Sequence, residues 1–358
     1  MDNLLERYDP WITEKGPAAL VIREYLMPVD GPDGVLFPPT FAAGDGFPGG
    51  YNIDDFGDGK NVCLIDSVGS QANRIEPIFA EDEYAPLVPQ VVIKAGSKSV
   101  NLLEAGHRAG DAVVRCSALQ SELQQAFKAV QRGDCEPLAK IAPTSIVFGA
   151  WDSRDTQAKL PRLLASTIRA FDVRRLTRSA QYIPAVEYIG DGLLPEPADR
   201  AAADKYAERG FVHVPATATH GGVIATGGIR RDAYLHLAAL RLVAATDGEK
   251  TQSLRRYILG LALTAFTYPS VGYLRQGCNL VLDPDWKRPR EFKEVYPDGT
   301  RKDAALKHED ALEYAKAAAK AFRVGSNREL EFKSELAQQD MHDNAGKRSG
   351  KNKDAKPK

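Results

Sequence analysis

The residues best suited to chemistry in this 358-residue sequence are the basic side chains between positions 154 and 178. This segment reads RDTQAKLPRLLASTIRAFDVRRLTR and has a net charge of +5, because two aspartates oppose seven cations. We call it the basic block, and its cations are Arg154, Lys159, Arg162, Arg169, Arg174, Arg175 and Arg178. Six of the seven are arginines, whose planar guanidinium suits phosphate oxygens. The basic block therefore predicts a surface that binds the phosphates of a nucleic acid.

The basic block is compatible with two conformations. A helix over 159–171 would place its cations opposite an apolar stripe, whereas an extended 167–175 would place Arg169 and Arg175 on one face. Both conformations give a surface strip of guanidiniums. Two nearby aromatic residues could stack on bases, as in single-strand binders: Phe171 and Tyr182. The competing interpretation is a solvated face with local ion pairs.

Motifs of the common enzyme classes are absent from the sequence. We find no GxxxxGK[ST], no GxGxxG after a strand, no GxSxG and no HExxH. The histidines are dispersed: His107, His213, His220, His236, His308 and His342. His213 and His220 flank a predicted strand and would lie on its opposite faces, and the HGG at 220–222 reads as a turn. The sequence thus predicts neither a metal site nor a cofactor.

The overall composition is that of a globular protein, with 27% charged and 43% hydrophobic residues and a formal net charge of -1. It excludes collagen, extended disorder and a disulfide scaffold. The four cysteines contain no CxxC pair, so we expect reduced thiols. The N-terminus lacks the features of a signal peptide, and no stretch of 18 apolar residues occurs. We therefore expect a cytoplasmic protein.

Two segments depart from this average composition. Residues 28–59 contain thirteen Gly and Pro and six Asp, without a single Lys or Arg. We expect a long acidic surface loop there, or a loop that contacts a partner or a neighbouring copy. The last eighteen residues carry six Lys and Arg and few apolar side chains, which predicts a disordered basic tail over 341–358. The remaining 1–340 is expected to form one domain.

Hydrophobic periodicity indicates an irregular mixture of strands and helices. We expect strands at 61–68, 89–94 and 146–153, and a helix from Cys116 to Val130. Three further helices are expected toward the C-terminus: one from Asp232 to Asp247, one from Ser253 to Tyr268, and one from about Asp303 to Val324, closed by Gly325. Because the pattern shows no regular βαβα alternation, the predicted fold class is α+β.

Three segments also resemble a known family. They are SVGSQANRIEP (67–77), FGAWDSRDTQAKLPRLLASTIRAFDVRRLTRSAQYIP (148–184) and GGIRRDAYLHLAALR (227–241). These segments resemble the CRISPR-associated RAMP-superfamily backbone subunit, the Cas-seven type, of type I-G (formerly I-U) effector complexes. The acidic Pro/Gly-rich loop is similar to the N-terminal region of that family.

The resemblance implies a modified RRM (ferredoxin-like) core with large insertions. It also implies a non-catalytic subunit whose copies polymerise head to tail along the spacer of a CRISPR RNA, next to other effector-complex subunits. The guide then pairs with target DNA, and a protruding hairpin displaces bases at intervals. Carried over by motif position, the implied guide contacts are Ser70, Gln71, Asn73, Arg74, Lys159, Arg162, Arg169, Arg174, Arg175 and Arg178.

Two other functions compete with this one. The first is an RNA endonuclease of the same superfamily, with His220 or His213 as general base, or with an aspartate such as Asp152, Asp155 or Asp172 as in type III relatives. We expect those aspartates to form structural ion pairs instead. The second alternative is a metabolic enzyme with an unrecognised pocket.

Overall fold

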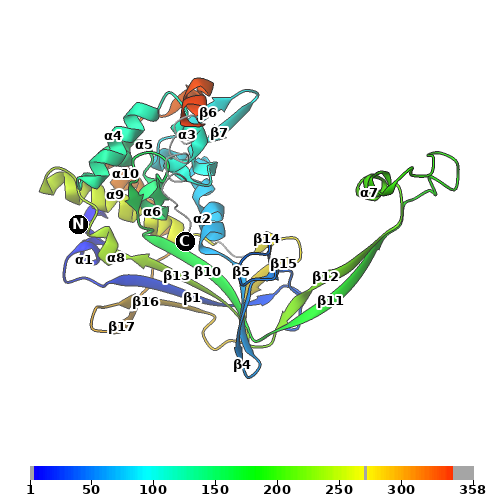
Figure 1. Ribbon diagram of the computed structural model, residues 1–358. Helices are drawn as coiled ribbons and strands as arrows, with labels where there is room; N and C mark the ends of the chain where they lie inside the picture. Colours follow the sequence, from blue (N-terminus) through cyan, green and yellow to red (C-terminus); the bar gives the residue numbers. More distant parts are fainter. Residues whose placement is uncertain (1–3, 270–271, 342–358) are drawn as a thin grey trace, which may run out of the picture.

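The computed structural model describes residues 4–269 and 272–341, and its centre is a curled antiparallel sheet (Figure 1). The strands of this sheet are β1 (Ala19–Pro28), β4 (Ile53–Gly57), β5 (Lys60–Asp66), β10 (Leu164–Phe171), β13 (Ile229–His236), β14 (Tyr273–Arg275), β15 (Cys278–Leu282), β16 (Arg290–Val295) and β17 (Arg301–Asp303). The main path runs β14-β15-β1-β13-β10-β5-β4, while β16 pairs with β1 and β17 pairs with β16. The fold is mixed α+β, as predicted.

Smaller sheets surround the large one. They are formed by β2 (Thr40–Phe41) with β3 (Gly50–Tyr51), by β8 (Ala150–Trp151) with β9 (Lys159–Leu160), by β11 (Val173–Tyr182) with β12 (Val214–Ala225), and by β6 (Val91–Ala95) with β7 (Lys98–Asn101) and β18 (Arg328–Glu331).

The α-helices are α1 (Asp9–Ile12), α2 (Val68–Ile75), α3 (Ala112–Arg115), α4 (Gln120–Gln131), α5 (Glu136–Ile141), α6 (Thr144–Phe148), α7 (Arg200–Glu208), α8 (Leu237–Leu240), α9 (Gly248–Thr267) and α10 (His308–Phe322). Short 3-10 turns occur at η1 (Leu4–Glu6), η2 (Glu76–Ala80), η3 (Ala85–Leu87), η4 (Leu102–Glu104) and η5 (Arg108–Gly110). Each helix in the described ranges is too short or too polar to cross a membrane.

The central strands have one buried face and one half-exposed face. Along β1 and β13 the exposure of the side chains alternates from residue to residue, which is the period of a strand. Figure 1 shows the helices, apart from α7, on one side of β1, β13 and β10. We call the opposite side the open face of the sheet. It bears Tyr25 and Arg23 from β1 and Tyr234 and Arg230 from β13, since these residues alternate with the buried ones.

The largest apolar cluster lies where the helices cover the sheet, and α9 is its centre. This helix packs along α10 closely enough that a Cβ atom built on Gly260 would lie 2.9 Å from the Cα atom of Ala315. The two backbones therefore touch at a position where only glycine fits.

We expect Gly260→Ala to destabilise the protein by about 1–3 kcal/mol, because the two helices would have to move apart. An ordinary glycine inside a helix behaves oppositely, since alanine favours the helix by about 1 kcal/mol. Gly69→Ala in α2 is the matched control, because its new Cβ would meet only Ser67 Oγ at 3.8 Å. Urea denaturation measures both variants. Equal stabilities of Gly260→Ala and the wild type would contradict this close packing.

A second, smaller apolar cluster supports a long two-stranded ribbon formed by β11 and β12. The ribbon leaves the body of the protein and carries α7 near its far end (Figure 1). The segment expected to be a structureless loop at 28–59 folds partly against the root of this ribbon. Leu36 is buried and exchanges backbone hydrogen bonds with Val223 of 2.9 and 2.8 Å, and Gly222 N donates to the hydroxyl of Tyr51. The expectation of a long surface loop is therefore wrong for these parts, and also for Ile53–Gly57, which form the edge strand β4.

Several predicted elements are confirmed. The strands expected at 61–68 and 89–94 are β5 and β6, and the helix expected after Cys116 corresponds to α4. Gly133 follows that helix with a φ of 89°, in the left-handed region that favours glycine. Residues 342–358, which hold nearly all of the predicted basic tail, lie outside the described residues.

The strand predicted at 146–153 is wrong. Its first part belongs to α6, which ends at Gly149 with a φ of 79°, and only Ala150 and Trp151 are in a strand. All five residues of α6 are buried. A fully buried helix presents the same unbroken apolar run as a buried strand, so periodicity could not separate the two.

The helix predicted from Asp232 to Asp247 is also wrong, because β13 continues to His236 and only the single turn α8 follows. Asp247 instead begins the next helix, where its carboxylate accepts a hydrogen bond of 2.8 Å from the backbone N–H of Lys250. The cap predicted at Ser253 is therefore wrong.

The boundaries of the last predicted helix also differ from the structure. Asp303 belongs to β17, so α10 begins five residues later at His308. The helix ends where Arg323 adopts a left-handed φ of 57°, so the predicted closing role of Gly325 is wrong.

Candidate nucleic-acid interface

The basic block forms two extended strands that meet at a corner. β10 contains Arg169, and β11 contains Arg174, Arg175 and Arg178. Between them Asp172 has a φ of 49°, so the chain turns instead of continuing as one strand. The predicted helix over 159–171 is thus wrong, and the extended alternative is correct only as two separate strands.

Three arginines of the block lie on the ribbon near its root. Arg174 pairs across the ribbon with Ile224 and Arg175 with Val223, and all three arginines, including Arg178, are exposed. The first strand of the ribbon therefore carries three exposed guanidiniums as it leaves the body, with the neighbours Arg174 and Arg175 on opposite faces.

The cations of the basic block have no acidic partners. Within 4–269 and 272–341, none of the seven lies within 4.0 Å of a carboxylate oxygen, although many other arginines do. The two aspartates of the block are engaged elsewhere: Asp155 accepts a hydrogen bond from Gln124, and Asp172 accepts one from the backbone N–H of Asn61. Local ion pairs, the competing interpretation, are therefore not formed in this part of the structure.

The open face continues the positive surface beyond the ribbon. Arg169 lies opposite Arg230 in the sheet, and the guanidinium of Arg230 lies 4.8 Å from the centre of the Phe171 ring. Asp232 is shared by Arg230 and Arg23, at 2.8 and 3.0 Å, so one carboxylate opposes three arginines there.

The contribution of β13 to this face was missed from the sequence. The alternation in IRRDAYLH was a usable signal, because its apolar side chains recur at every second position. A helix was predicted there instead, because Asp232 is a residue type that often begins a helix.

The implied contacts on α2 belong partly to the fold. Asp66 is fully buried, and its carboxylate receives hydrogen bonds from Gln71 at 2.7 Å, Arg74 at 3.2 Å and Arg275 at 2.8 Å. Gln71 is itself fully buried and also accepts from Ser166 Oγ at 2.8 Å. Gln71 therefore supports the helix from beneath, whereas the side chain of Arg74 remains 36% exposed.

The other two implied residues of α2 are more accessible. The backbone N–H of Ser70 donates to Ser67 Oγ at the start of the helix, 3.1 Å away. Asn73 is exposed, and its Oδ1 accepts a hydrogen bond of 3.4 Å from Arg108. Arg108 thereby connects α2 to the loops that carry the first cations of the basic block.

Lys159 and Arg162 line a cavity of about 450 Å³ together with Arg108, His107 and Trp151. Arg108 and His107 come from a segment that was not singled out from the sequence, and Trp151 lies in the resembling segment 148–184 but was not among the implied contacts. The indole of Trp151 is 57% exposed, and Lys159 Nζ lies 5.6 Å from the centre of its ring. The charged side chains that line this cavity are all basic.

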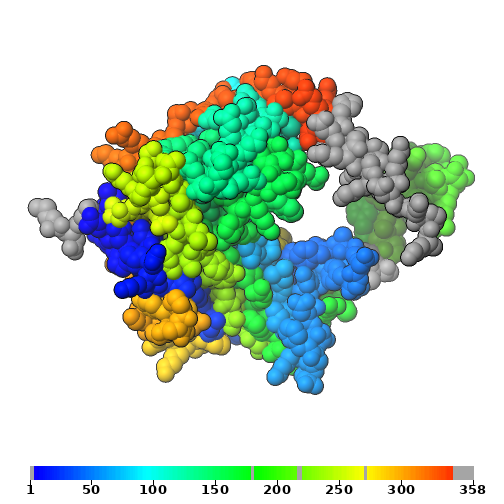
Figure 2. Space-filling model, turned by 60° about the vertical axis from the view of Figure 1, so that its left-hand side comes forward, coloured from blue at the N-terminus to red at the C-terminus, as the bar shows by residue number. Residues whose placement is uncertain are grey.

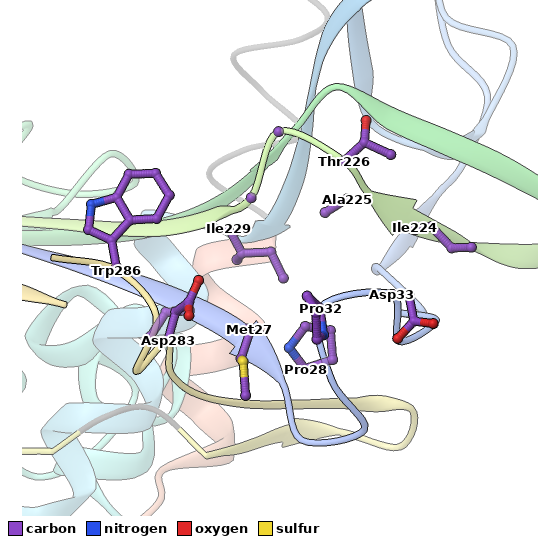
Figure 3. A pocket seen from close by; sticks show the side chains of 13 residues that line it. Met27, Pro28, Pro32, Asp33, Ile224, Ala225, Thr226, Ile229, Asp283 and Trp286 are labelled. Atoms are coloured by element: carbon purple, nitrogen blue, oxygen red, sulfur yellow. The ribbon is translucent and has the colours of Figure 1, made fainter.

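A second cavity of about 640 Å³ lies at the root of the ribbon (Figure 3). Its walls include Met27, Pro32 and the indole of Trp286, which stacks on Tyr25 with ring centres 4.1 Å apart. The charged side chains that line it are Asp33 and Asp283, so this cavity has the opposite sign.

Acidic side chains also project from the edge of the large sheet that ends in β4. Figure 2 shows β4 and β5 as a lobe in lighter blue that stands out from the body. Asp54, Asp55 and Asp58 are exposed there, beside Phe56, which is 69% exposed. The aspartates of this acidic lobe belong to residues 28–59, the segment that contains six Asp and no Lys or Arg.

The histidines of the endonuclease alternative lie near the ribbon. His220 is inside β12 and packs on Tyr51 with ring centres 4.8 Å apart, while His213 immediately precedes that strand. The turn predicted at 220–222 is therefore wrong. Asp152 is buried and accepts hydrogen bonds from Thr156 of 2.8 and 2.6 Å, so its partner is a threonine where an ion pair was expected. The described residues contain no group of three or more His, Cys, Asp or Glu placed to hold a metal ion.

The four cysteines are all buried and free. Burial raises the pKa of Cys63 to about 12 and that of Cys278 to about 11. A thiol with so high a pKa is protonated at neutral pH and is a poor nucleophile. These cysteines are packing residues.

Part of the chain is similar to a known protein family. A search of curated proteins found no match. Residues 20–175 match the family described as CRISPR-associated protein GSU0053. That stretch runs from β1 through α2 and β10 to the third residue pair of the ribbon, and it contains every implied guide contact except Arg178. The similarity to the CRISPR-associated protein GSU0053 family thus covers residues 20–175, which is less than half of the chain.

Proposed function

We propose that this protein is a non-catalytic CRISPR RNA-binding subunit that coats the spacer of the guide in a type I effector complex. The observation that carries the proposal is the set of seven cations in the basic block, which have no acidic partner among residues 4–269 and 272–341 and continue from the cavity near Trp151 to the ribbon. Positive charge without acidic partners is the electrostatic footprint of a nucleic-acid surface.

The chemistry of this surface favours the RNA backbone over the bases. Guanidiniums in series bind phosphates, which fix the position of a strand without reading its sequence. A subunit that must coat any spacer needs such a contact, because each guide has a different sequence. The guide bases then remain available to pair with target DNA.

The strand order supports an RRM (ferredoxin-like) core. In the order β15-β1-β13-β10 all neighbours are antiparallel, helices such as α2 connect β1 to β10, and α9 connects β13 to β15. This order is compatible with the βαββαβ connectivity of that fold, and the ribbon would then be an insertion between its second and third strands.

Opposite charges support head-to-tail association of copies. The acidic lobe and the unpaired arginines lie on different parts of one chain, so two copies could join them in a heterologous contact that does not close. Such contacts build helical arrays. Other effector-complex subunits would bind the ends of the array.

We expect the affinity for RNA to be independent of spacer sequence. Competition between unrelated spacers of equal length should give dissociation constants within a few-fold of one another, because phosphates and sugars are the same in each. A preference beyond about a hundredfold, roughly 2.7 kcal/mol, would contradict backbone recognition.

The endonuclease alternative has its own discriminating measurement. A binding subunit should leave RNA at full length after long incubation with Mg²⁺, as judged on a denaturing gel. Cleavage that disappears in His220→Ala or His213→Ala would establish the endonuclease and refute the non-catalytic assignment.

A further inference from the structure

The cavity beside Trp151 has a lining suited to an anion with an aromatic ring. Its basic side chains are Arg108, Lys159, Arg162 and His107, and among the described residues no acidic side chain lines it. Its volume of about 450 Å³ lies within the range of small-molecule sites, roughly 300–1,000 Å³. The cavity is therefore large enough for one nucleotide.

The positive charge of this cavity is built into the fold. Arg108 is only 4% exposed and is held 2.5 Å from Glu76, which lies behind it and is 1% exposed. Arg108 also has a φ of 55°, a left-handed conformation that is uncommon for a residue other than glycine. A strained backbone that presents a buried guanidinium to a cavity is typical of a functional site.

One carboxylate faces the two guanidiniums of this cavity. Burial raises the pKa of that group, Glu76, to about 7, although Arg108 acts in the opposite direction. Arg162 forms no ion pair with the described residues, and both burial and the charge of Arg108 lower its pKa. A bound anion would stabilise both guanidiniums.

Trp151 supplies the aromatic wall. Its indole is 57% exposed although the other large aromatic side chains nearby, such as Phe148, are buried. A base of any identity can stack on such a ring, because every base has a flat π face. The cation Lys159, 5.6 Å from the ring centre, would lie beside the phosphate of a stacked nucleotide.

We propose that this cavity binds one nucleotide of an RNA strand, with the base stacked on Trp151 and the phosphate held by Lys159, Arg162 and Arg108. The proposal rests on the proposed function for the source of the nucleotide, and it adds a base-stacking site to the backbone contacts of the ribbon. An unpaired base is required, because a base inside a duplex has no free face for the indole.

Tryptophan fluorescence tests the proposal directly, with adenosine 5′-monophosphate (AMP) as the probe. In Trp286→Phe, where Trp151 remains, AMP should quench the emission in a saturable way. In Trp151→Phe the quench should disappear, although Trp286 is 43% exposed, because its cavity carries two carboxylates. Absence of a saturable quench in Trp286→Phe, or its persistence in Trp151→Phe, would overturn the proposal.

The phosphate contact and the source of the nucleotide are tested by two further arms. Arg162→Ala should weaken the binding of AMP at least tenfold but leave the binding of adenosine unchanged. Equal effects on both affinities would show that Arg162 does not bind the phosphate. An RNA tetranucleotide should quench Trp151 at concentrations at least tenfold lower than AMP. Quenching by AMP that the tetranucleotide does not reproduce would overturn the RNA assignment.

Failure of this proposal is distinguishable from failure of the proposed function. Guide RNA that binds the wild type and Trp151→Phe equally, without an AMP quench, would refute the cavity alone. Saturable AMP binding at Trp151 without any binding of guide RNA would refute the coating function and the RNA source while leaving a nucleotide site.

Discussion

Replacing Arg174, Arg175 and Arg178 together by alanine should weaken RNA binding steeply and flatten its dependence on salt. For single strands, the slope of log K against log salt is about 0.7 per neutralised phosphate. Loss of three phosphate contacts should therefore remove roughly 2 units of slope. The three side chains are exposed and unpaired within the described residues, so circular dichroism should remain native.

A control variant separates the effect of lost positive charge from the effect of losing these three phosphate contacts. In this control, alanine replaces three arginines that lie outside the basic block and pair with carboxylates, so the same total charge is removed. They are Arg7, Arg288 and Arg328. That control should leave the slope nearly unchanged. Lysine at the three ribbon positions should recover most of the slope but less of the affinity, since ammonium lacks the two-pronged geometry. An unchanged slope in the folded ribbon variant would make these arginines ordinary surface charges.

Glu24→Ala should destabilise the protein by about 3–5 kcal/mol, because it leaves a buried cation without its partner. Glu24 Oε2 lies 2.6 Å from Arg231 Nη1, and Arg231 Nε donates to Ser166 Oγ at 2.9 Å. The side chains of the ion pair are 8% and 2% exposed. This network joins three neighbouring strands of the sheet on its buried face, so its loss should affect the core that holds the open face in shape.

An exposed ion pair provides the comparison for Glu24→Ala. Glu329 and Lys94 are 61% and 45% exposed, so Glu329→Ala should cost about 1 kcal/mol or less. Urea denaturation followed by circular dichroism measures both variants. A Glu24→Ala variant within about 1 kcal/mol of the wild type would show that Arg231 finds water or another acceptor.

The basic block could be predicted from sequence because charge is a local property. Its excess of arginine is visible without a structure, and so is the acidic composition of residues 28–59. Their conformations depended on tertiary pairing. The corner at Asp172 cannot be read from a segment that also carries a helical stripe, and the burial of Leu36 depends on its backbone bonds with Val223.

The parts of the site that escaped prediction are those assembled from distant segments. Gln71 looks like a surface residue of a polar helix, yet it is buried because Asp66 and Ser166 both bond to it across β5 and β10. The cavity at Trp151 brings together 106–108, 149–153 and 159–162. No spacing rule joins these segments, since the intervening helices α3 to α6 determine their approach.

The central claim is that copies of this chain coat guide RNA in register with its spacer. The mass of the complex on guides with two spacer lengths, measured by size-exclusion chromatography with light scattering, tests it most directly. We expect the mass of the complex to increase with spacer length, in steps of whole copies of the 39.1 kDa chain. A mass that is independent of spacer length would contradict it.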